Sequence, residues 1–194
     1  MSLESAQSVI SQDIDKIISA VGKDYFQPLA GKDLLITGPQ GLLGGYIVDT
    51  IARLNETILH DTPCFVVGLS RSPITRESRL GHLSRFDEHF AFTKHHDVSR
   101  AYQYYPGYSP DFIIHAAGRS SPAIFTQDPI GTIDINVTAL RWLLDLATDS
   151  KIKSFGWMSS SEIYGNPPPE EIPTPETYHG NSDSLGVRNC YTES

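Results

Sequence analysis

Three glycines stand three residues apart, at Gly38, Gly41 and Gly44. The apolar run Leu34–Thr37 before them predicts a buried strand, and Leu42–Leu54 after them has the periodicity of a helix. Glycines at such a turn let the backbone approach a pyrophosphate, which the following helix N-terminus attracts. The alternative is a glycine-rich turn without a ligand. The residues expected at a dinucleotide here are Gly38, Gly41, Leu42, Leu43 and Gly44.

Four further apolar runs predict strands, and a longer periodic segment predicts a helix. The strands are expected at Cys64–Leu69, Ala91–Lys94, Phe112–Ala116 and Phe155–Met158, and the helix at Thr132–Ala147. Strands that alternate with helices build a parallel sheet covered on both faces. We therefore expect an α/β fold, a Rossmann-like doubly wound parallel sheet, over residues 31–194.

Residues 1–30 precede this domain as a helical extension. Ile10, Ile14, Ile17, Ile18 and Val21 follow the spacing of one helix face. We expect this helix to pack on the main domain, with a partner protein as the alternative surface. At the other end, residues 166–175 hold five prolines in ten positions, which predicts an irregular loop.

The composition is that of a soluble globular protein, with 39% hydrophobic and 20% charged residues in 194. A net charge of -8 disfavours nucleic acid and anionic membranes as partners. No apolar stretch is long enough to span a bilayer, so a cytoplasmic location is expected. Two cysteines, Cys64 and Cys190, are too few for a disulfide scaffold. The adjacent pair His95–His96 would point to opposite sides of a strand, so no metal site is expected.

The residues after the second strand bear on the ribose of the cofactor. An acidic residue there would favour NAD, whereas this chain has Ser70 and Arg71. Arg71 could pair with the 2′-phosphate of NADP, or it could be a solvated loop residue that stacks on adenine. The sequence leaves NAD and NADP open.

Two more strand ends are expected at the cofactor. After the third strand come Asp97 and Val98, where Asp97 would accept a hydrogen bond from the adenine amino group or cap a helix. After the fourth strand, small residues let the cofactor lie against the backbone, and His115 is expected to be a packed core residue. The small residues are Ala116, Ala117 and Gly118.

The fifth strand runs into Ser159-Ser160-Ser161-Glu162, a polar cluster at the end where open α/β sheets place their chemistry. The alternative is a serine-rich turn with a solvated carboxylate. Several segments together then carry a family resemblance. They are the glycine turn, Ile114–Ala117, Asn136, Ser159–Gly165, Thr174–Asn181 and Gly186–Tyr191.

Over roughly residues 32–194 the chain resembles the extended short-chain dehydrogenases that modify nucleotide sugars. The segment from Thr174 to Tyr191 is more specific, and it resembles UDP-glucuronate decarboxylases and dTDP-glucose 4,6-dehydratases. The resemblance implies a nicotinamide cofactor, with NAD first and NADP possible, and a nucleotide-sugar substrate. It also implies that Asn136 lies at the cofactor.

The resemblance implies roles for five more residues. Ser160 matches the residue that hydrogen-bonds the reacting sugar hydroxyl, and Tyr191 matches the tyrosine that takes the proton from the 4-hydroxyl. Ser161 and Glu162 fall where relatives place the groups for the second step, Glu162 as a catalytic residue and Ser161 as a substrate contact. Arg188 matches a basic position near the substrate, with a surface ion pair as the alternative.

Tyr191 begins a Tyr-x-x-x-Lys pattern whose lysine would fall one position past Ser194. A free tyrosine has a pKa of about 10, and lowering it to neutrality needs roughly 4 kcal/mol. A lysine one helical turn later supplies much of that. We expect these 194 residues, without that lysine and the C-terminal substrate lobe, to be inactive. We expect the helix that begins near Leu185 to fray, and dimerisation in the parent protein rather than in this chain.

Three functions remain open at this point. The first is the cofactor part of an enzyme that oxidises C4 of a nucleotide sugar and lets the sugar epimerise, dehydrate or decarboxylate. The second is a non-catalytic dinucleotide-binding module or subunit. The third, simple reduction of a small carbonyl compound, fits the glycine turn but not Tyr178–Tyr191. The sequence decides neither the sugar nor the second step.

Overall fold

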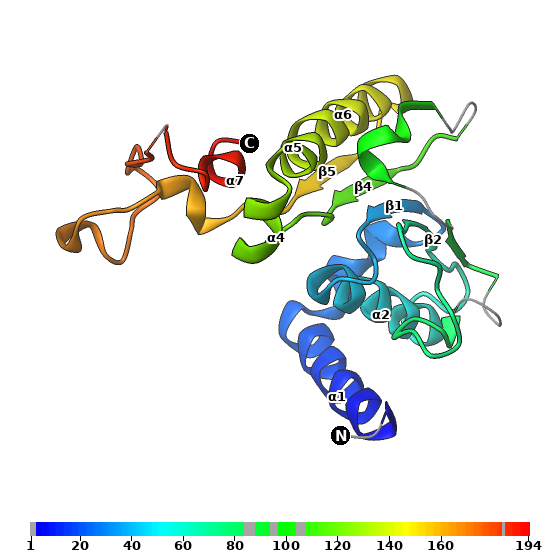
Figure 1. Ribbon diagram of the computed structural model, residues 1–194. Helices are drawn as coiled ribbons and strands as arrows, with labels where there is room; N and C mark the ends of the chain where they lie inside the picture. The colour runs from blue at the N-terminus through cyan, green and yellow to red at the C-terminus, as the bar shows by residue number, and fades with distance from the viewer. Residues whose placement is uncertain (1–2, 84–87, 94–96, 104–107, 184) are drawn as a thin grey trace.

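The computed structural model describes residues 3–83, 88–93, 97–103, 108–183 and 185–194. A single five-stranded parallel sheet has the strand order β3-β2-β1-β4-β5 (Figure 1). The strands are β1 (Asp33–Thr37), β2 (Phe65–Leu69), β3 (Phe90–Phe92), β4 (Phe112–His115) and β5 (Ser154–Trp157). The Rossmann-like fold class is therefore confirmed. The predicted third strand ended at Lys94, which lies outside the described residues, as do His95 and His96.

The register of the sheet brings three strand ends together. Thr37, the last residue of β1, lies opposite Leu69 of β2 and His115 of β4. The residues that follow these strands therefore leave the sheet at the same edge. This is the edge at which a doubly wound sheet binds ligands.

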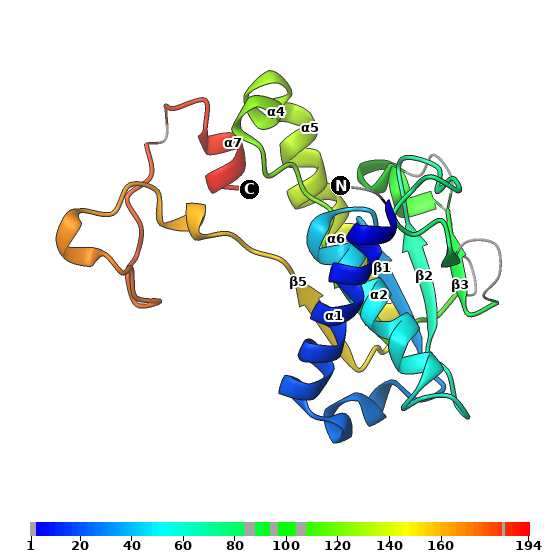
Figure 2. The ribbon, with the colours of Figure 1, turned by 90° about the horizontal axis from the view of Figure 1, so that it is seen from below.

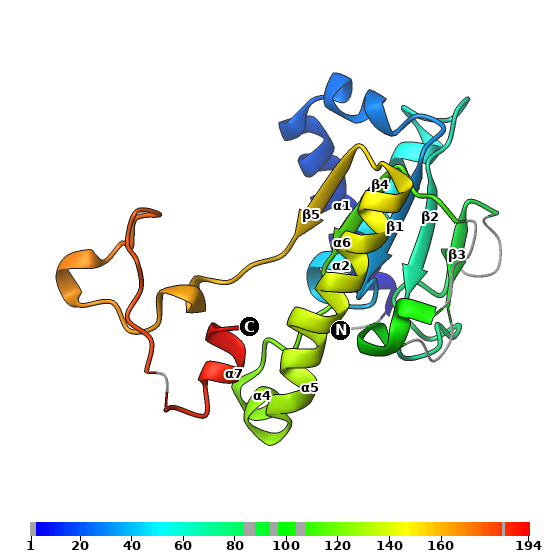
Figure 3. The same cartoon turned by 90° about the horizontal axis from the view of Figure 1, so that it is seen from above.

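Helices cover both faces of the sheet, as parallel strands require. In Figure 2 the helices α1 (Leu3–Val21) and α2 (Leu42–Glu56) lie over one face. In Figure 3 α6 (Ala139–Ser150) lies over the other. Successive residues of β1 point to opposite faces, so Leu34 and Ile36 pack with α2 while Leu35 packs beneath α6.

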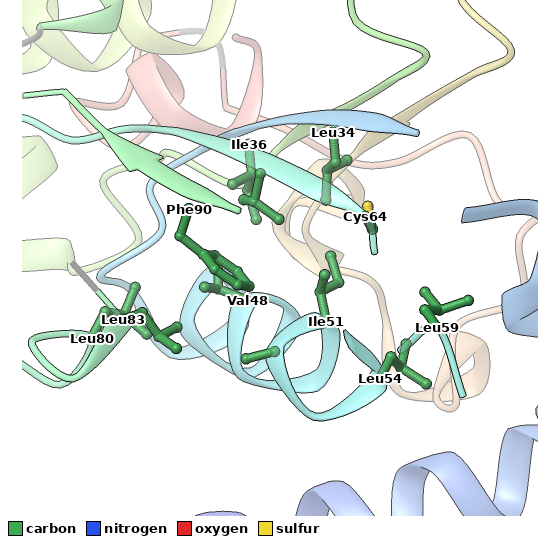
Figure 4. Close-up of a cluster of buried hydrophobic side chains, with 12 residues drawn as sticks. Leu34, Ile36, Val48, Ile51, Leu54, Leu59, Cys64, Leu80, Leu83 and Phe90 are labelled. Atoms are coloured by element: carbon green, nitrogen blue, oxygen red, sulfur yellow. The ribbon is translucent and has the colours of Figure 1, made fainter. Parts of the chain in front are cut away.

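The core on the α2 side is the larger cluster of buried side chains (Figure 4). Val48, Ile51 and Leu54 recur along one face of α2 and pack against the sheet. Phe90 and Leu80 close the side toward β3. On the opposite face Ile113, Leu143 and their neighbours form the second cluster.

The predicted helix Thr132–Ala147 is one continuous helical stretch with different limits. It begins as α5 (Pro129–Ile133), passes through one π-helical segment, η3 (Asp134–Thr138), and continues as α6. Asp128 caps its start by accepting from the Gly131 N–H, and Lys151 ends it in the left-handed conformation. The short helix α4 (Pro122–Gln127) precedes it.

The N-terminal helix was predicted from its apolar stripe and is confirmed as α1. Ile14 is buried and Ile18 packs against the α2-side core, whereas Ile17 and Val21 stay partly exposed. The Tyr46 hydroxyl of α2 also donates to Asp13 at 3.1 Å. The extension continues through the 3₁₀ helix η1 (Lys23–Leu29) into β1. No described helix is long and apolar enough to cross a membrane.

Residues 158–194, here called the outer segment, leave the sheet after β5 and extend away from it (Figures 1 and 3). They contain the 3₁₀ helices η4 (Ser161–Tyr164) and η5 (Pro169–Glu171) and the short helix α7 (Asn189–Thr192). The prediction of a helix starting near Leu185 is wrong: turns occupy that stretch, and α7 begins at Asn189. None of the described residues of the outer segment is buried.

Candidate cofactor pocket and catalytic residues

The glycine turn lies in contact with the end of β4. Gly38 has a φ of +67°, and a Cβ atom there would lie 2.8 Å from Cα of Ala117. The Gly41 N–H donates to the Gly38 carbonyl at 3.0 Å, which closes the turn before α2 starts. A Cβ at Gly44 would collide with the Gly38 carbonyl oxygen. Gly38 and Gly44 are therefore needed for the shape of the turn, and together they hold the N-terminus of α2 at the sheet edge.

A pocket of about 340 Å³ opens at this edge. Its walls come from the glycine turn and from the ends of β2 and β4, with Asp97 and Val98 on a further side. The predicted cofactor residues that line it are Gly38, Gly41, Ser70, Arg71, Asp97, Val98, Ala116, Ala117 and Gly118. The other four do not line it. Leu42 and Leu43 are largely exposed, Gly44 is buried in α2, and the Asn136 amide donates to the Ser194 hydroxyl at 2.8 Å.

Gln40 connects the glycine turn to the residues after β2. Its amide nitrogen donates to the Ser70 hydroxyl at 2.6 Å and to the Ser72 carbonyl at 2.8 Å. The Ser70 N–H donates to the Thr93 hydroxyl at 2.9 Å, and Ser70 is buried. Arg71 beside it is exposed. The sequence reasoning missed Gln40, although it stands inside the fingerprint and is the one polar side chain between Gly38 and Gly44.

Asp97 lies at the pocket, where it was predicted, and makes the hydrogen bonds of a helix cap. Its Oδ1 accepts from the Ser99 N–H at 3.1 Å and from the Ser99 hydroxyl at 2.8 Å, at the start of η2 (Val98–Gln103). Partial burial acts to raise the pKa of Asp97. The Ser99 hydrogen bonds and the charges of Arg100 and Arg71 outweigh it and lower that pKa. Asp97 and Arg71 therefore place opposite charges in the lining of the same pocket.

His115 is the packed core histidine that was predicted. The Thr37 hydroxyl accepts from the Ala117 N–H at 3.0 Å and lies 2.7 Å from Nδ1 of His115. Nε2 of the ring lies 3.3 Å from the carbonyl oxygen of Ile135. A carbonyl only accepts, so the proton is assigned to Nε2. Burial lowers the pKa of His115 and favours the neutral ring, whose Nδ1 then accepts from the Thr37 hydroxyl. The network fixes Ala117 at the floor of the pocket.

The outer segment brings two of the predicted residues together. Nε of Arg188 donates to Oε2 of Glu162 at 2.6 Å, and Nη2 donates to Oε1. The Glu162 hydrogen bonds, followed by its charge, raise the pKa of Arg188. Both side chains are solvent-accessible, at 32% for Glu162 and 57% for Arg188. The pair borders a small hollow of about 130 Å³.

Ser160 and Tyr191 are not among the residues that line the glycine pocket. The Ser160 hydroxyl accepts from the Glu162 N–H at 3.2 Å and so caps η4, and Ser161 is exposed. The Tyr191 ring stacks on Phe125 of α4, with ring centroids 5.0 Å apart and planes 6° from parallel. Phe125 directly follows Ile124, which lines the pocket, so Tyr191 packs on the helix that supplies part of that lining. The lining of the pocket includes none of the predicted catalytic residues.

Several pocket residues were not predicted from the sequence. Arg119, Ser120 and Ser121 directly follow Gly118, and Ile124 and Ile135 come from the next helices. The signal for the first three was their position, because a polar run after a buried strand opens at the ligand edge of a parallel sheet. Among the described residues, no group of three or more His, Cys, Asp or Glu is placed to hold a metal ion.

Two curated proteins are similar in sequence to most of this chain. UDP-glucuronic acid decarboxylase 1 of Arabidopsis thaliana is 33% identical over 161 residues, which are 82% of this chain and 33% of that protein. UDP-glucuronic acid decarboxylase 1 of Xenopus tropicalis is 31% identical over 163 residues, which are 84% of this chain and 34% of that protein. The chain therefore spans about a third of the length of these relatives.

Solved structures of related fold match as well. UDP-glucose 4-epimerase of Thermotoga maritima matches with a TM-score of 0.61 and 22% identity, over 83% of this chain and 47% of that one. ADP-L-glycero-D-manno-heptose-6-epimerase of Helicobacter pylori matches with a TM-score of 0.59 and 21% identity, over 85% and 48%. At these identities the likeness shows the fold.

A family match covers the sheet, the glycine turn and the outer segment together. It runs over residues 34–194 and leaves α1 outside. The curated relatives agree with it over a similar share of the chain. The chain belongs to the NAD-dependent epimerase/dehydratase family.

Proposed function

We propose that this chain is the cofactor-binding part of a nucleotide-sugar epimerase, dehydratase or decarboxylase. The observation that carries the proposal is the pocket itself: the glycine turn and the ends of β2 and β4 meet there, inside the segment that matches the family. The identity to UDP-glucuronic acid decarboxylases favours a UDP-sugar acid as the first substrate to test.

The residues of the pocket fit a dinucleotide. Gly38 and the backbone of Ala117 form a cradle that a Cβ atom would fill. Gly41 is the N-cap of α2, whose N-terminus attracts a pyrophosphate. Ser70 and Arg71 would hold the adenosine ribose, and Asp97 would lie near the adenine. We propose NAD as the cofactor, in keeping with the family, and Arg71 makes NADP its competitor.

The catalytic roles extend this proposal to the outer segment. A bound nicotinamide supplies the hydride acceptor and donor. Ser160 would orient the sugar 4-hydroxyl, and Tyr191 would take its proton. Glu162 would serve the second step, with Ser161 and Arg188 on the substrate. These side chains lie outside the pocket, so the proposal requires the outer segment to close against the pocket when the substrate binds.

A second candidate is a dinucleotide-binding module without catalysis. The separation of Ser160 and Tyr191 from the pocket favours it, as does the lack of buried residues in the described part of the outer segment. The codon that follows Ser194 in the gene distinguishes the two candidates. A lysine codon directly after Ser194, followed by a further lobe, supports the enzyme; a stop codon supports the module.

Calorimetric titration of the 194 residues with NAD and with NADP tests the proposal. We expect micromolar binding, with the preferred dinucleotide deciding the role of Arg71. Each complex is then mixed with UDP-glucuronate or dTDP-glucose, and absorbance at 340 nm is followed. Because Ser160 and Tyr191 lie outside the pocket, we expect binding without sustained turnover. Failure to bind either dinucleotide contradicts the proposal; reduction of the nicotinamide contradicts the module.

A further inference from the structure

Arg119 is a cation at the pocket that the sequence reasoning did not assign. It directly follows Gly118 at the end of β4 and lines the same pocket as Gly38 and Gly41. The glycine turn and this strand end touch, because a Cβ atom on Gly38 would lie 2.8 Å from Cα of Ala117. Arg119 therefore belongs to the strand end that contacts the turn where a diphosphate is expected.

One donor of Arg119 lacks an acceptor. Its Nη1 pairs with the carboxylate of Asp128, which also accepts from the Gly131 N–H at 3.0 Å and caps α5. Its Nε is buried, and no acceptor among the described residues lies within hydrogen-bonding distance. A buried N–H without a partner is unfavourable, and a guanidinium carries five donors in a rigid fork. Nε is closed to solvent in this conformation, so the guanidinium must turn toward the pocket before Nε can donate to a ligand there.

The charges around the pocket favour an anionic ligand there. Its lining carries Arg71, Arg119 and one carboxylate, Asp97, and the latter is engaged by Ser99. The chain as a whole has a net charge of -8, so this site opposes the overall field of the protein. Asp128 offsets part of the Arg119 charge without using its Nε.

We propose that Arg119 binds the diphosphate of the dinucleotide, with its guanidinium turning so that the unpartnered Nε donates a charge-assisted hydrogen bond to a phosphate oxygen. The proposal rests on the dinucleotide site described above. It assigns a binding role to this residue and no part in proton or hydride transfer. A planar guanidinium suits a phosphate oxygen better than an ammonium does, since its donors have fixed directions. The Arg119 charge would then add to the attraction of the α2 N-terminus.

The test is calorimetric titration of the chain and of its Arg119→Gln variant with NAD. Adenosine, which lacks the diphosphate, is the matched ligand and is followed by NMR. We expect Arg119→Gln to lower the affinity for NAD about 10- to 100-fold, because a hydrogen bond to a charged group is lost. The affinity for adenosine should fall less than about 3-fold. Arg141→Gln is the matched control, because Arg141 is an exposed arginine paired with Asp145 on α6.

Two further variants guard against indirect effects. Asp128→Asn keeps an N-cap residue and frees Nη1, so NAD affinity should stay equal or rise. Arg119→Lys keeps the charge without the fork, so NAD affinity should be intermediate. The inference is overturned if folded Arg119→Gln loses affinity equally for NAD and adenosine, or if its affinity for NAD is unchanged. Either result contradicts the role of Arg119 and does not contradict the proposed cofactor site. If the unchanged chain binds no dinucleotide, the proposed function fails with it.

Discussion

The part of the chain that forms the pocket and the outer segment that carries Ser160, Glu162 and Tyr191 are built differently. Each contains an arginine that makes two hydrogen bonds to one carboxylate. In the first part, Arg79 donates to Oδ2 of Asp49 at 3.0 and 2.8 Å, and the Asp49 side chain is only 7% exposed. In the outer segment, the Arg188–Glu162 pair has similar distances but lies in solvent.

The comparison shows that different kinds of contact hold the pocket and the predicted catalytic residues in place. The pocket is held by buried strands, a glycine turn and a histidine network, all within the sheet domain. The predicted catalytic residues are held by exposed turns, the Arg188–Glu162 pair and the stacking of Tyr191 on Phe125. Catalysis of the proposed kind needs a site closed to water, which strengthens its electrostatic interactions. The outer segment must therefore gain cover before it can act.

Removal of Arg79 should give the largest effect on stability. Burial raises the pKa of Asp49, and the Arg79 hydrogen bonds and charge act against that shift. Arg79→Met removes both hydrogen bonds to the buried carboxylate and leaves it, among the described residues, only His82 at 3.9 Å. It should cost about 3–5 kcal/mol of unfolding free energy, measured by urea denaturation. The double variant Asp49→Leu with Arg79→Met is the control, because it removes both charges. A loss below about 1 kcal/mol in the single variant would show that burial does not distinguish the two pairs.

A side chain at Gly38 should damage the pocket directly. Gly38→Ala puts an alanine at positive φ and against Ala117, which should cost about 2–4 kcal/mol of stability and abolish dinucleotide binding. Gly31→Ala is the matched control. Gly31 also has a positive φ, but no atom lies within 4 Å of its added Cβ. Gly31→Ala should cost about 1–2 kcal/mol of unfolding free energy and leave dinucleotide binding unchanged. Equal binding losses in both variants would contradict the role of the turn.

The histidine network should make the stability of the pocket region depend on pH. Burial lowers the pKa of His115 in the folded state, so below about pH 6.5 the unfolded chain binds a proton that the folded one does not. Stability is therefore fully present above that pH and falls as the pH drops, by at most about 1.4 kcal/mol per unit for one proton.

Urea denaturation at pH 7.5 and 5.5 checks this dependence. His115→Gln removes the titrating ring, so the variant should lose about 1 kcal/mol less than the unchanged chain over this interval. The two proteins differ at this one position, so contributions from the rest of the chain cancel in the comparison. An identical loss in both would mean that His115 does not resist protonation.

The same comparison explains what the sequence could predict. The strands, the N-terminal helix and the glycine turn follow from local patterns, since apolar periodicity and glycine spacing are decided by nearby residues. The sequence also led to Ser70, Arg71 and Asp97, because residues after parallel strands meet at one edge. It did not reveal the links of Gln40 to Ser72 or of Arg119 to Asp128, which join segments that are separate in the sequence.

The outer segment was harder to predict for a physical reason. Few buried contacts restrict it, so the start of α7 at Asn189 and the stacking of Tyr191 on Phe125 depend on packing between distant parts of the chain. Motif matching assigned Ser160, Glu162 and Tyr191 to one catalytic cluster. The structure joins Glu162 with Arg188 and leaves Tyr191 against α4. Local sequence rules carry no information on such distances.

Removal of Arg188 should have the smallest effect on stability and sharpens the comparison most. Arg188→Met breaks a pair as well formed as Arg79–Asp49, yet it should cost far less unfolding free energy than Arg79→Met, because water replaces the lost partner of Glu162. Denaturation in low and high salt separates the charge from the packing of the side chain, since salt screens exposed charges. A cost near that of Arg79→Met would mean that the outer segment is already covered in solution. The segment would then be an assembled half of a site rather than one that awaits closure.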